Sequence, residues 1–176
     1  PPNAGAVSGL RYALECLPGT IVAGDLFDVV PLDENRALVM LGDVMGKGAG
    51  AGFVMAMVQT YLTTRASELS DLPKLLDSAN RLFFQRFKGG GFVTLWIGIF
   101  DRRDLSVQFI DAGHGHWGLL SGGVFRMIES PGGPPLGMIE QVAYASDHLQ
   151  LGSADRILLY SDGLIEQSNN EGVLFG

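Results

Sequence analysis

The stretch LGDVMGKGAG, residues 41–50, places an aspartate inside a glycine-rich loop at the junction of two predicted elements. The preceding run RALVML, residues 36–41, is almost entirely apolar, which is typical of a strand buried on both faces. After the loop, apolar residues recur at helical spacing: Phe53, Val54, Met57, Val58, Tyr61 and Leu62. We therefore expect a strand, a tight loop and a helix whose apolar stripe packs in the core, together with the neighbouring Met55.

A second helix and a series of strands are predicted to follow. The helix has Asp71 as its N-cap and Pro73 in its first turn, and it ends at the glycines of residues 89–91. The strands carry alternating or continuous apolar residues between turn sequences: residues 92–100, 105–111, 116–120, 124–128, 142–151 and 156–160. Because the helices cluster between early and late strands and do not alternate with them, the order predicts an α+β layered fold with helices outside strand-rich sheets.

Composition limits the class of protein. With 176 residues and 47% hydrophobic content, the chain suits one domain with a substantial buried core. A net charge of -7, without any run of Lys and Arg, argues against a nucleic-acid surface. No apolar run approaches the length needed to cross a bilayer, and the start lacks a signal-peptide pattern, so we expect no membrane partner and a cytoplasmic location. The single Cys16 fits a reducing compartment, in the core or in a linker, and is not expected to act as a nucleophile.

A nucleotide-binding loop is one interpretation of the glycine-rich stretch. Such a loop needs the pattern G-x-x-x-x-G-K-[ST], whose backbone N–H groups surround the phosphates. The spacing from Gly42 to Gly46 is one residue too short, and Gly48 stands where Ser or Thr is required. Asp43 also adds a negative charge where phosphate would sit, so this interpretation is disfavoured.

A metal site is the alternative, because other aspartates follow the same pattern. The sequence AGDLFD supplies Asp25 and Asp28, and the two most hydrophobic predicted strands end in LGDV with Asp43 and YSDG with Asp162. Mg²⁺ and Mn²⁺ prefer oxygen ligands and often take only one or two carboxylates per ion. The loop glycines would let the backbone turn tightly around such ions and offer a carbonyl. Strand ends of this kind can meet at one sheet edge. Cations bound there would remove the repulsion between Asp43 and a phosphate group.

Four segments resemble the metal-dependent PPM (PP2C-like) protein phosphatases, in the bacterial branch of the SpoIIE/RsbU type. They are VAGDLFDVVPLDENRALVMLGDVMGKGAGAGFVMAMVQ, FVTLWIGIFDRRDLSVQFIDAGHGHWGLL, GGPPLGM and RILLYSDGLIEQSNNEGVLFG. The resemblance implies a four-layer αββα sandwich of two mainly antiparallel sheets flanked by helices. It also implies two Mn²⁺ or Mg²⁺ ions at one end of the sheets, and hydrolysis of phosphoserine or phosphothreonine by a water held between them.

The resemblance assigns roles residue by residue. It makes Asp43 the ligand shared by both ions, with the Val44 carbonyl adding to one of them, and makes Asp25 and Asp162 ligands directly or through water. Asp28 is expected to contact the ligand residues without binding an ion itself. Gly46 and Lys47 belong to the loop that would face the substrate. Simpler interpretations stay open at two of these positions, because Asp28 is as readily a turn residue and Lys47 a solvated loop residue.

The same resemblance frames the domain boundaries and partners. Residues 1–16 are expected to be a linker or the end of a preceding region, and residues 17–176 a phosphatase domain that is truncated at its C-terminal end. The implied substrate is a phosphorylated protein such as an anti-sigma-factor antagonist, with a sensor or receiver domain upstream in the parent chain.

Two further interpretations complete the sequence-based expectations. Family members carry another metal-binding aspartate beyond the final FG, so the alternative function is an impaired phosphatase-fold adaptor that binds a sigma-factor regulatory partner.

His114 and His116 resemble a transition-metal pair, but no third ligand is evident, and structural or surface roles are expected for both.

Overall fold

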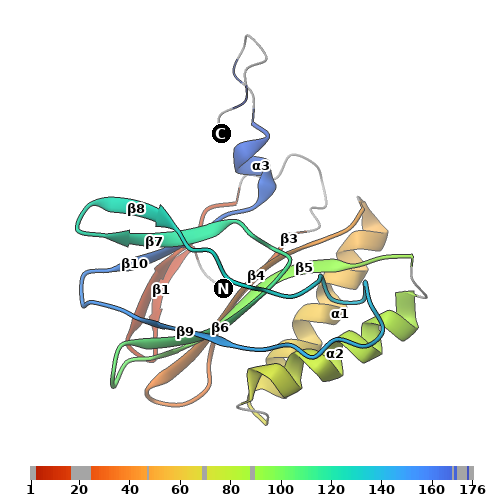
Figure 1. Ribbon diagram of the computed structural model, residues 1–176, viewed down its shortest axis with the longest axis horizontal. Helices are drawn as coiled ribbons and strands as arrows, with labels where there is room; N and C mark the ends of the chain where they lie inside the picture. Colours follow the sequence, from red (N-terminus) through yellow and green to blue (C-terminus); the bar gives the residue numbers. More distant parts are fainter. Residues whose placement is uncertain are drawn as a thin grey trace.

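The computed structural model describes residues 3–16, 25–46, 48–68, 71–87, 90–167, 169 and 174, and Figure 1 shows the arrangement of their elements. A five-stranded antiparallel sheet has the order β3-β4-β5-β6-β9, and a three-stranded antiparallel sheet has the order β10-β7-β8. A separate hairpin pairs β1 with β2. The bounds are β1 Ala4–Val7, β2 Leu10–Ala13, β3 Asp25–Pro31, β4 Arg36–Val44, α1 Ala49–Ala66, α2 Leu72–Phe87, β5 Val93–Asp101, β6 Ser106–Ala112, β7 Trp117–Ser121, β8 Val124–Met127, β9 Asp147–Gln150, β10 Arg156–Leu159 and α3 Asp162–Ile165.

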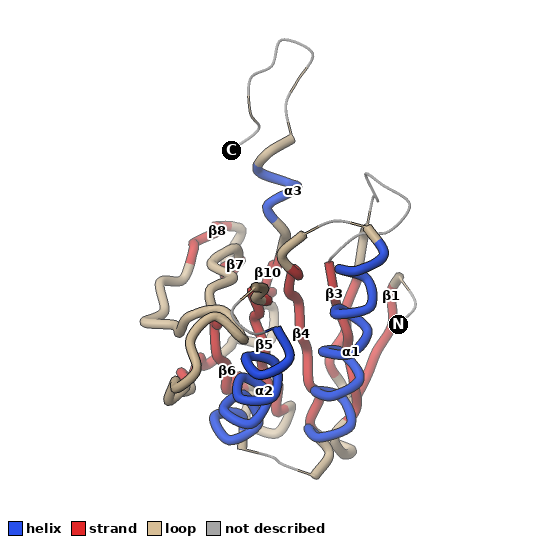
Figure 2. The backbone as a smooth tube through the Cα atoms, turned by 90° about the vertical axis from the view of Figure 1, so that its right-hand side faces the viewer, coloured by secondary structure: helices blue, strands red, loops and turns tan. Residues whose placement is uncertain are grey.

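Helices α1 and α2 cover one face of the five-stranded sheet (Figure 2). Successive strand residues point to opposite faces, so Leu38 and Met40 of β4 face the helices while Val39 faces away. Asp71 caps α2 through a 3.1 Å hydrogen bond from the backbone N–H of Lys74 to its carboxylate. In the part of the chain that the structure describes, no helix is both long and apolar enough to cross a membrane.

The other face of the large sheet packs against the three-stranded sheet through an aromatic core. Trp96 of β5 lies 5.8 Å from Phe109 of β6 and 5.5 Å from Trp117 of β7, measured between ring centroids. Gly98 makes room for the Trp96 ring, because a Cβ at Gly98 would lie 2.5 Å from the indole. Trp96 and Trp117 therefore join the two sheets into a sandwich.

The predicted α+β class with two antiparallel sheets and flanking helices is confirmed. Among the described residues the helical cover lies over the large sheet, and no long helix covers the outer face of the small one. One detail of α1 was predicted wrongly, since Phe53 is 76% exposed and Met57 is 38% exposed. The buried residues of α1 are Ala51, Val58, Leu62 and Ala66. Apolar side chains surround this helix, so its sequence alone does not select the face that meets the sheet.

The N-terminal segment, expected to be a linker or the end of a preceding region, contains regular structure. The strands Ala4–Val7 and Leu10–Ala13 form an antiparallel hairpin, and β1 lies against β3. The chain reverses through Ser8 and Gly9, both of which have positive φ angles. The pairing of β1 with β2 satisfies the backbone hydrogen-bonding groups of this segment. Its Pro/Gly/Ala-rich composition does not predict strands.

Candidate metal centre

The large sheet brings two of the predicted ligands face to face. In the antiparallel pair β3–β4, Asp25 lies directly opposite Asp43, and Asp43 in turn lies opposite Thr94 of β5. Residues directly opposite each other share a face of the sheet. Since Val39 and Trp96 belong to the core between the sheets, the alternation of side chains places Asp25, Asp43 and Thr94 in a row on that same face. The row lies at the end of the sheet sandwich.

The third predicted ligand reaches this end from the small sheet. Strand β10 ends at Leu159, and Tyr160 and Ser161 lead into the single turn α3, where Asp162 is the first residue. The Ser161 side chain interacts with the Asp25 carboxylate and lowers its pKa, and the charge of Asp162 acts on both Asp25 and Asp43. Figure 2 shows α3, the start of β3 and the start of α1 at the same end of the molecule.

The charges of Asp25, Asp43 and Asp162 act on one another at this end of the sandwich. Burial, followed by the charges of Asp25 and Asp162, raises the pKa of Asp43 to about 6 from its ordinary value of 3.8. Burial and the charge of Asp162 also raise the pKa of Asp25, while hydrogen bonds with Ser161 and Asp43 oppose that rise. Two partly buried carboxylates and the exposed carboxylate of Asp162 thus repel one another, and a bound cation would relieve that repulsion.

The raised pKa predicts how the metal-free protein responds to pH. Because the folded state holds the Asp43 proton more tightly than the unfolded chain, Asp43 stabilises the fold at low pH, and this contribution is lost between about pH 4 and pH 6. The full shift corresponds to about 3 kcal/mol, and solvent screening of this half-buried group reduces the expected loss to about 1 kcal/mol.

Urea unfolding in EDTA at pH 5 and pH 7.5 measures this effect, with Asp43→Asn as the comparison. The variant should lose less stability over that interval and should be the more stable protein at pH 7.5 by about 1 kcal/mol. Identical pH dependence in both proteins would show that Asp43 is not the group responsible.

The glycine-rich loop after β4 has a backbone conformation that requires glycine at two positions. Val44 is buried at the end of β4, and Gly46 and Gly48 follow with φ angles of 109° and 82°, which favour glycine. A Cβ at either glycine would meet no atom within 4 Å, so these glycines are explained by backbone conformation and not by crowding. Lys47 lies outside the described residues.

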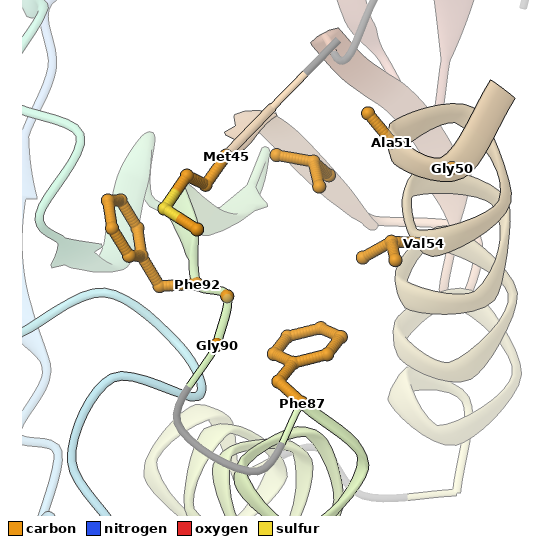
Figure 3. Close-up of a pocket in the computed structure, with 9 residues that line it drawn as sticks. Met45, Gly50, Ala51, Val54, Phe87, Gly90 and Phe92 are labelled. Atoms are coloured by element: carbon orange, nitrogen blue, oxygen red, sulfur yellow. The ribbon is translucent and has the colours of Figure 1, made fainter. Parts of the chain in front are cut away.

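A small apolar cavity of about 150 Å³ lies beside this loop. In Figure 3 the side chains of Met45, Val54 and Phe87 surround it, from the loop, α1 and the end of α2. It contains no acidic side chain. A larger hollow of about 520 Å³, between β2, the large sheet and β10, includes none of the three clustered aspartates. The acidic cluster is therefore separate from both cavities.

Asp28 does not join the cluster. The alternation along β3 places it on the helix-facing side of the sheet, opposite to Asp25. Its carboxylate accepts a 2.9 Å hydrogen bond from the side-chain amide of Gln59 on α1 and another of 2.9 Å from the backbone N–H of Val29. Asp28 thus ties α1 to β3, the strand that carries Asp25.

The donor set suits a hard divalent cation. Asp25 and Asp43 offer carboxylate oxygens side by side, and Mg²⁺ or Mn²⁺ is commonly held by one or two carboxylates with water completing its shell. Across the described ranges, no three Asp, Glu, His or Cys side chains converge on one point closely enough to hold a single ion. Asp162 therefore acts on the pair through its charge in this structure, and the fit is to a centre with few carboxylates per ion.

Sequence reasoning missed two contacts of the site. Ser161 was assigned no role from the sequence, yet its side chain interacts with the Asp25 carboxylate. Gln59 has no motif around it, and its bond to Asp28 spans 31 positions of the chain. A hydroxyl next to a candidate acidic ligand is the only signal that the sequence contained for either contact.

Comparisons with known proteins identify the family and the fold. The family described as stage II sporulation protein E (SpoIIE) matches residues 33–176. The phosphoserine phosphatase RsbU of Bacillus subtilis is 24% identical over 160 residues, covering 90% of this chain and 47% of RsbU. The chain thus spans less than half the length of that relative.

Solved structures share the fold. The PP2C phosphatase domain of Bacillus subtilis SpoIIE, solved with a fragment of its regulatory domain, has a TM-score of 0.75 and 24% identity, covering 84% of this chain and 44% of the other. RsbX in complex with magnesium has a TM-score of 0.66 and 19% identity, covering 83% of this chain and 69% of RsbX. The chain therefore belongs to the SpoIIE family and has the PP2C phosphatase fold.

Proposed function

We propose that this chain is a divalent-metal-dependent protein serine/threonine phosphatase domain of a bacterial signalling regulator. The observation that carries the proposal is the pairing of Asp25 with Asp43 at the end of the sheet sandwich, with the charge of Asp162 acting on both. The phosphoserine phosphatase activity named for RsbU supports a phosphoserine protein as the substrate class.

The ions implied by the fold would be held by residues of both sheets. Asp43 is proposed as the ligand shared between two Mn²⁺ or Mg²⁺ ions, with Asp25, Asp162 and the Val44 carbonyl completing the protein's donors. Such ions lower the pKa of bound water and neutralise the phosphate oxygens that gain charge during hydrolysis. RsbX, which shares the fold, was solved with magnesium, and this supports a hard cation.

The protein's own part in the reaction is to hold the carboxylates of Asp25 and Asp43 in fixed positions. The β3–β4 ladder fixes the separation of Asp25 and Asp43, and the Ser161 hydroxyl orients Asp25. Gly46 and Gly48 present no side chain of their own to a phosphorylated segment approaching the cluster. We further propose that the substrate is a phosphorylated regulatory protein such as an anti-sigma-factor antagonist, and that a sensor or receiver domain precedes this domain in the parent chain.

Phosphate release from a phosphoserine protein tests the proposal through removal of the metal. Turnover is expected with Mn²⁺ or Mg²⁺, should fall to background in excess EDTA, and should return when the ion is restored in excess over the chelator. Turnover that persists in EDTA would contradict metal dependence. No turnover by the folded chain with several phosphoproteins and both ions would favour the partner-binding adaptor.

A further inference from the structure

A buried histidine lies next to the acidic cluster and has no assigned task. His114 is only 6% exposed, and its Nε2 atom has no hydrogen-bond partner among the described residues. Leaving a buried polar atom unpaired costs about 1–3 kcal/mol, so this position is not explained by stability. The histidine follows β6, on the segment that crosses from the large sheet to β7 of the small sheet.

The backbone around His114 is fixed by a buried aspartate. Asp111, which is 6% exposed, accepts a 2.7 Å hydrogen bond from the backbone N–H of His114 and one of 3.0 Å from that of Gly115. Gly113 has a φ angle of 75°, and a Cβ there would lie 2.7 Å from the ring of Pro135. The loop of residues 113–116 is therefore held rigidly at the end of the sandwich where the acidic cluster lies.

This loop contacts the segment that carries Asp162. The backbone N–H of Tyr160 donates a 3.1 Å hydrogen bond to the carbonyl of His116, and the ring of His116 lies 5.7 Å from the ring of Tyr160. The ring of His114 lies 5.8 Å from the ring of His116 in an edge-to-face arrangement, so the buried histidine packs against the one that contacts Tyr160. His116 thus contacts Tyr160 two residues before Asp162, and His114 packs against His116.

We propose that His114 is a positioning residue, which holds the Tyr160–Asp162 turn at the end of the sandwich and so fixes Asp162 beside Asp25 and Asp43. The contacts run from Asp111 to the backbone of the loop, from the ring of His114 to that of His116, and from His116 to Tyr160, which precedes Ser161 and Asp162. The contribution of His114 to ion binding rests on the proposed function. Its role in holding the Tyr160–Asp162 turn in place does not.

Hydrogen exchange and Mn²⁺ binding test the two parts separately. His114→Phe keeps the ring volume and removes both nitrogens, and His114→Gln keeps a polar group. The matched control is His148→Ala, at an exposed histidine of β9. In EDTA, the amides of residues 160–166 should exchange at least about tenfold faster in His114→Phe, and those of β3 should not change. His148→Ala should match the wild type.

The Mn²⁺ titration, read by the electron paramagnetic resonance of the free ion, reports on ligand placement. Supporting residues around a metal site typically change affinity about 10-fold to 100-fold, which is the weakening expected for His114→Phe. His114→Gln should recover a large part of that loss. If the phenylalanine variant does not melt cooperatively in EDTA, His114→Ala takes its place.

If the amides of residues 160–166 exchange at the wild-type rate in a folded variant, His114 does not hold the Tyr160–Asp162 turn. Faster exchange together with wild-type Mn²⁺ affinity would overturn the positioning of Asp162. If the wild-type chain binds no Mn²⁺ and releases no phosphate, the proposed function fails, and the exchange data still decide whether His114 holds the turn.

Discussion

Replacing Asp43 by asparagine is expected to lower metal-dependent phosphate release by at least about 10³-fold while leaving the fold intact. The asparagine keeps the shape of the side chain and can hydrogen-bond Asp25 across the ladder, but it no longer contributes negative charge to the cluster. Charge stabilisation by a catalytic metal is worth several kcal/mol, and each 1.36 kcal/mol corresponds to about tenfold in rate. Phosphate release under saturating Mn²⁺ measures the effect.

Asp33→Asn is the matched control for this substitution. Asp33 lies in the turn between β3 and β4, at the far end of the same hairpin, where it pairs with Arg36 at 2.7 Å on the surface. Such exposed pairs contribute little, so turnover should stay within about twofold of the wild type. Activity of Asp43→Asn within tenfold of the wild type would remove Asp43 from the proposed centre.

Replacing Trp96 by alanine is expected to lower the free energy of unfolding by about 3–5 kcal/mol. Trp96 is fully buried and contacts Phe109 and Trp117, so its loss leaves a cavity between the two sheets. For a domain of this size the loss corresponds to roughly 10 °C in melting temperature. Because the sandwich positions Asp162, which follows β10 of the small sheet, near Asp25 and Asp43 of the large sheet, the centre should weaken along with the fold.

The control for Trp96 is Phe53→Ala, which removes a large aromatic side chain that is 76% exposed on α1. Its effect on the free energy of unfolding should stay within about 0.5 kcal/mol, as for other surface substitutions. Urea unfolding curves measure both variants. A loss of less than 1 kcal/mol for Trp96→Ala would show that the two sheets are joined by other contacts.

The strand pattern of the sequence predicted more of this fold than the helical pattern did. Continuous apolar runs located β4 and β5, and the aspartates at strand ends indicated a shared location before any pairing was known. Helix α1 was located correctly, but its exposed Phe53 was expected in the core, because packing against the sheet and not periodicity chose the buried face. The β1–β2 hairpin was missed, since its pairing is stabilised by contacts between strands and not by local composition.

Some features of the candidate site could likewise be predicted from the sequence, and others could not. Asp25 and Asp43 lie in strands whose antiparallel register determines that they meet, and their motifs marked both. The opposite placement of Asp28 follows from strand alternation, which the motif spacing did not take into account. The contacts of His114 depend on a loop between two sheets, which requires the assembled sandwich and leaves no local pattern in the sequence.

Direct Mn²⁺ binding is the measurement that tests the central claim, namely that the aspartate cluster is a divalent-cation centre. Isothermal titration calorimetry of the wild-type chain and of Asp43→Asn at pH 7.5, above the pKa of Asp43, gives affinity and stoichiometry without depending on a substrate. The account predicts saturable binding to the wild type and at least about tenfold weaker binding to the variant. Equal binding to both proteins, or none to the folded wild type, would contradict it.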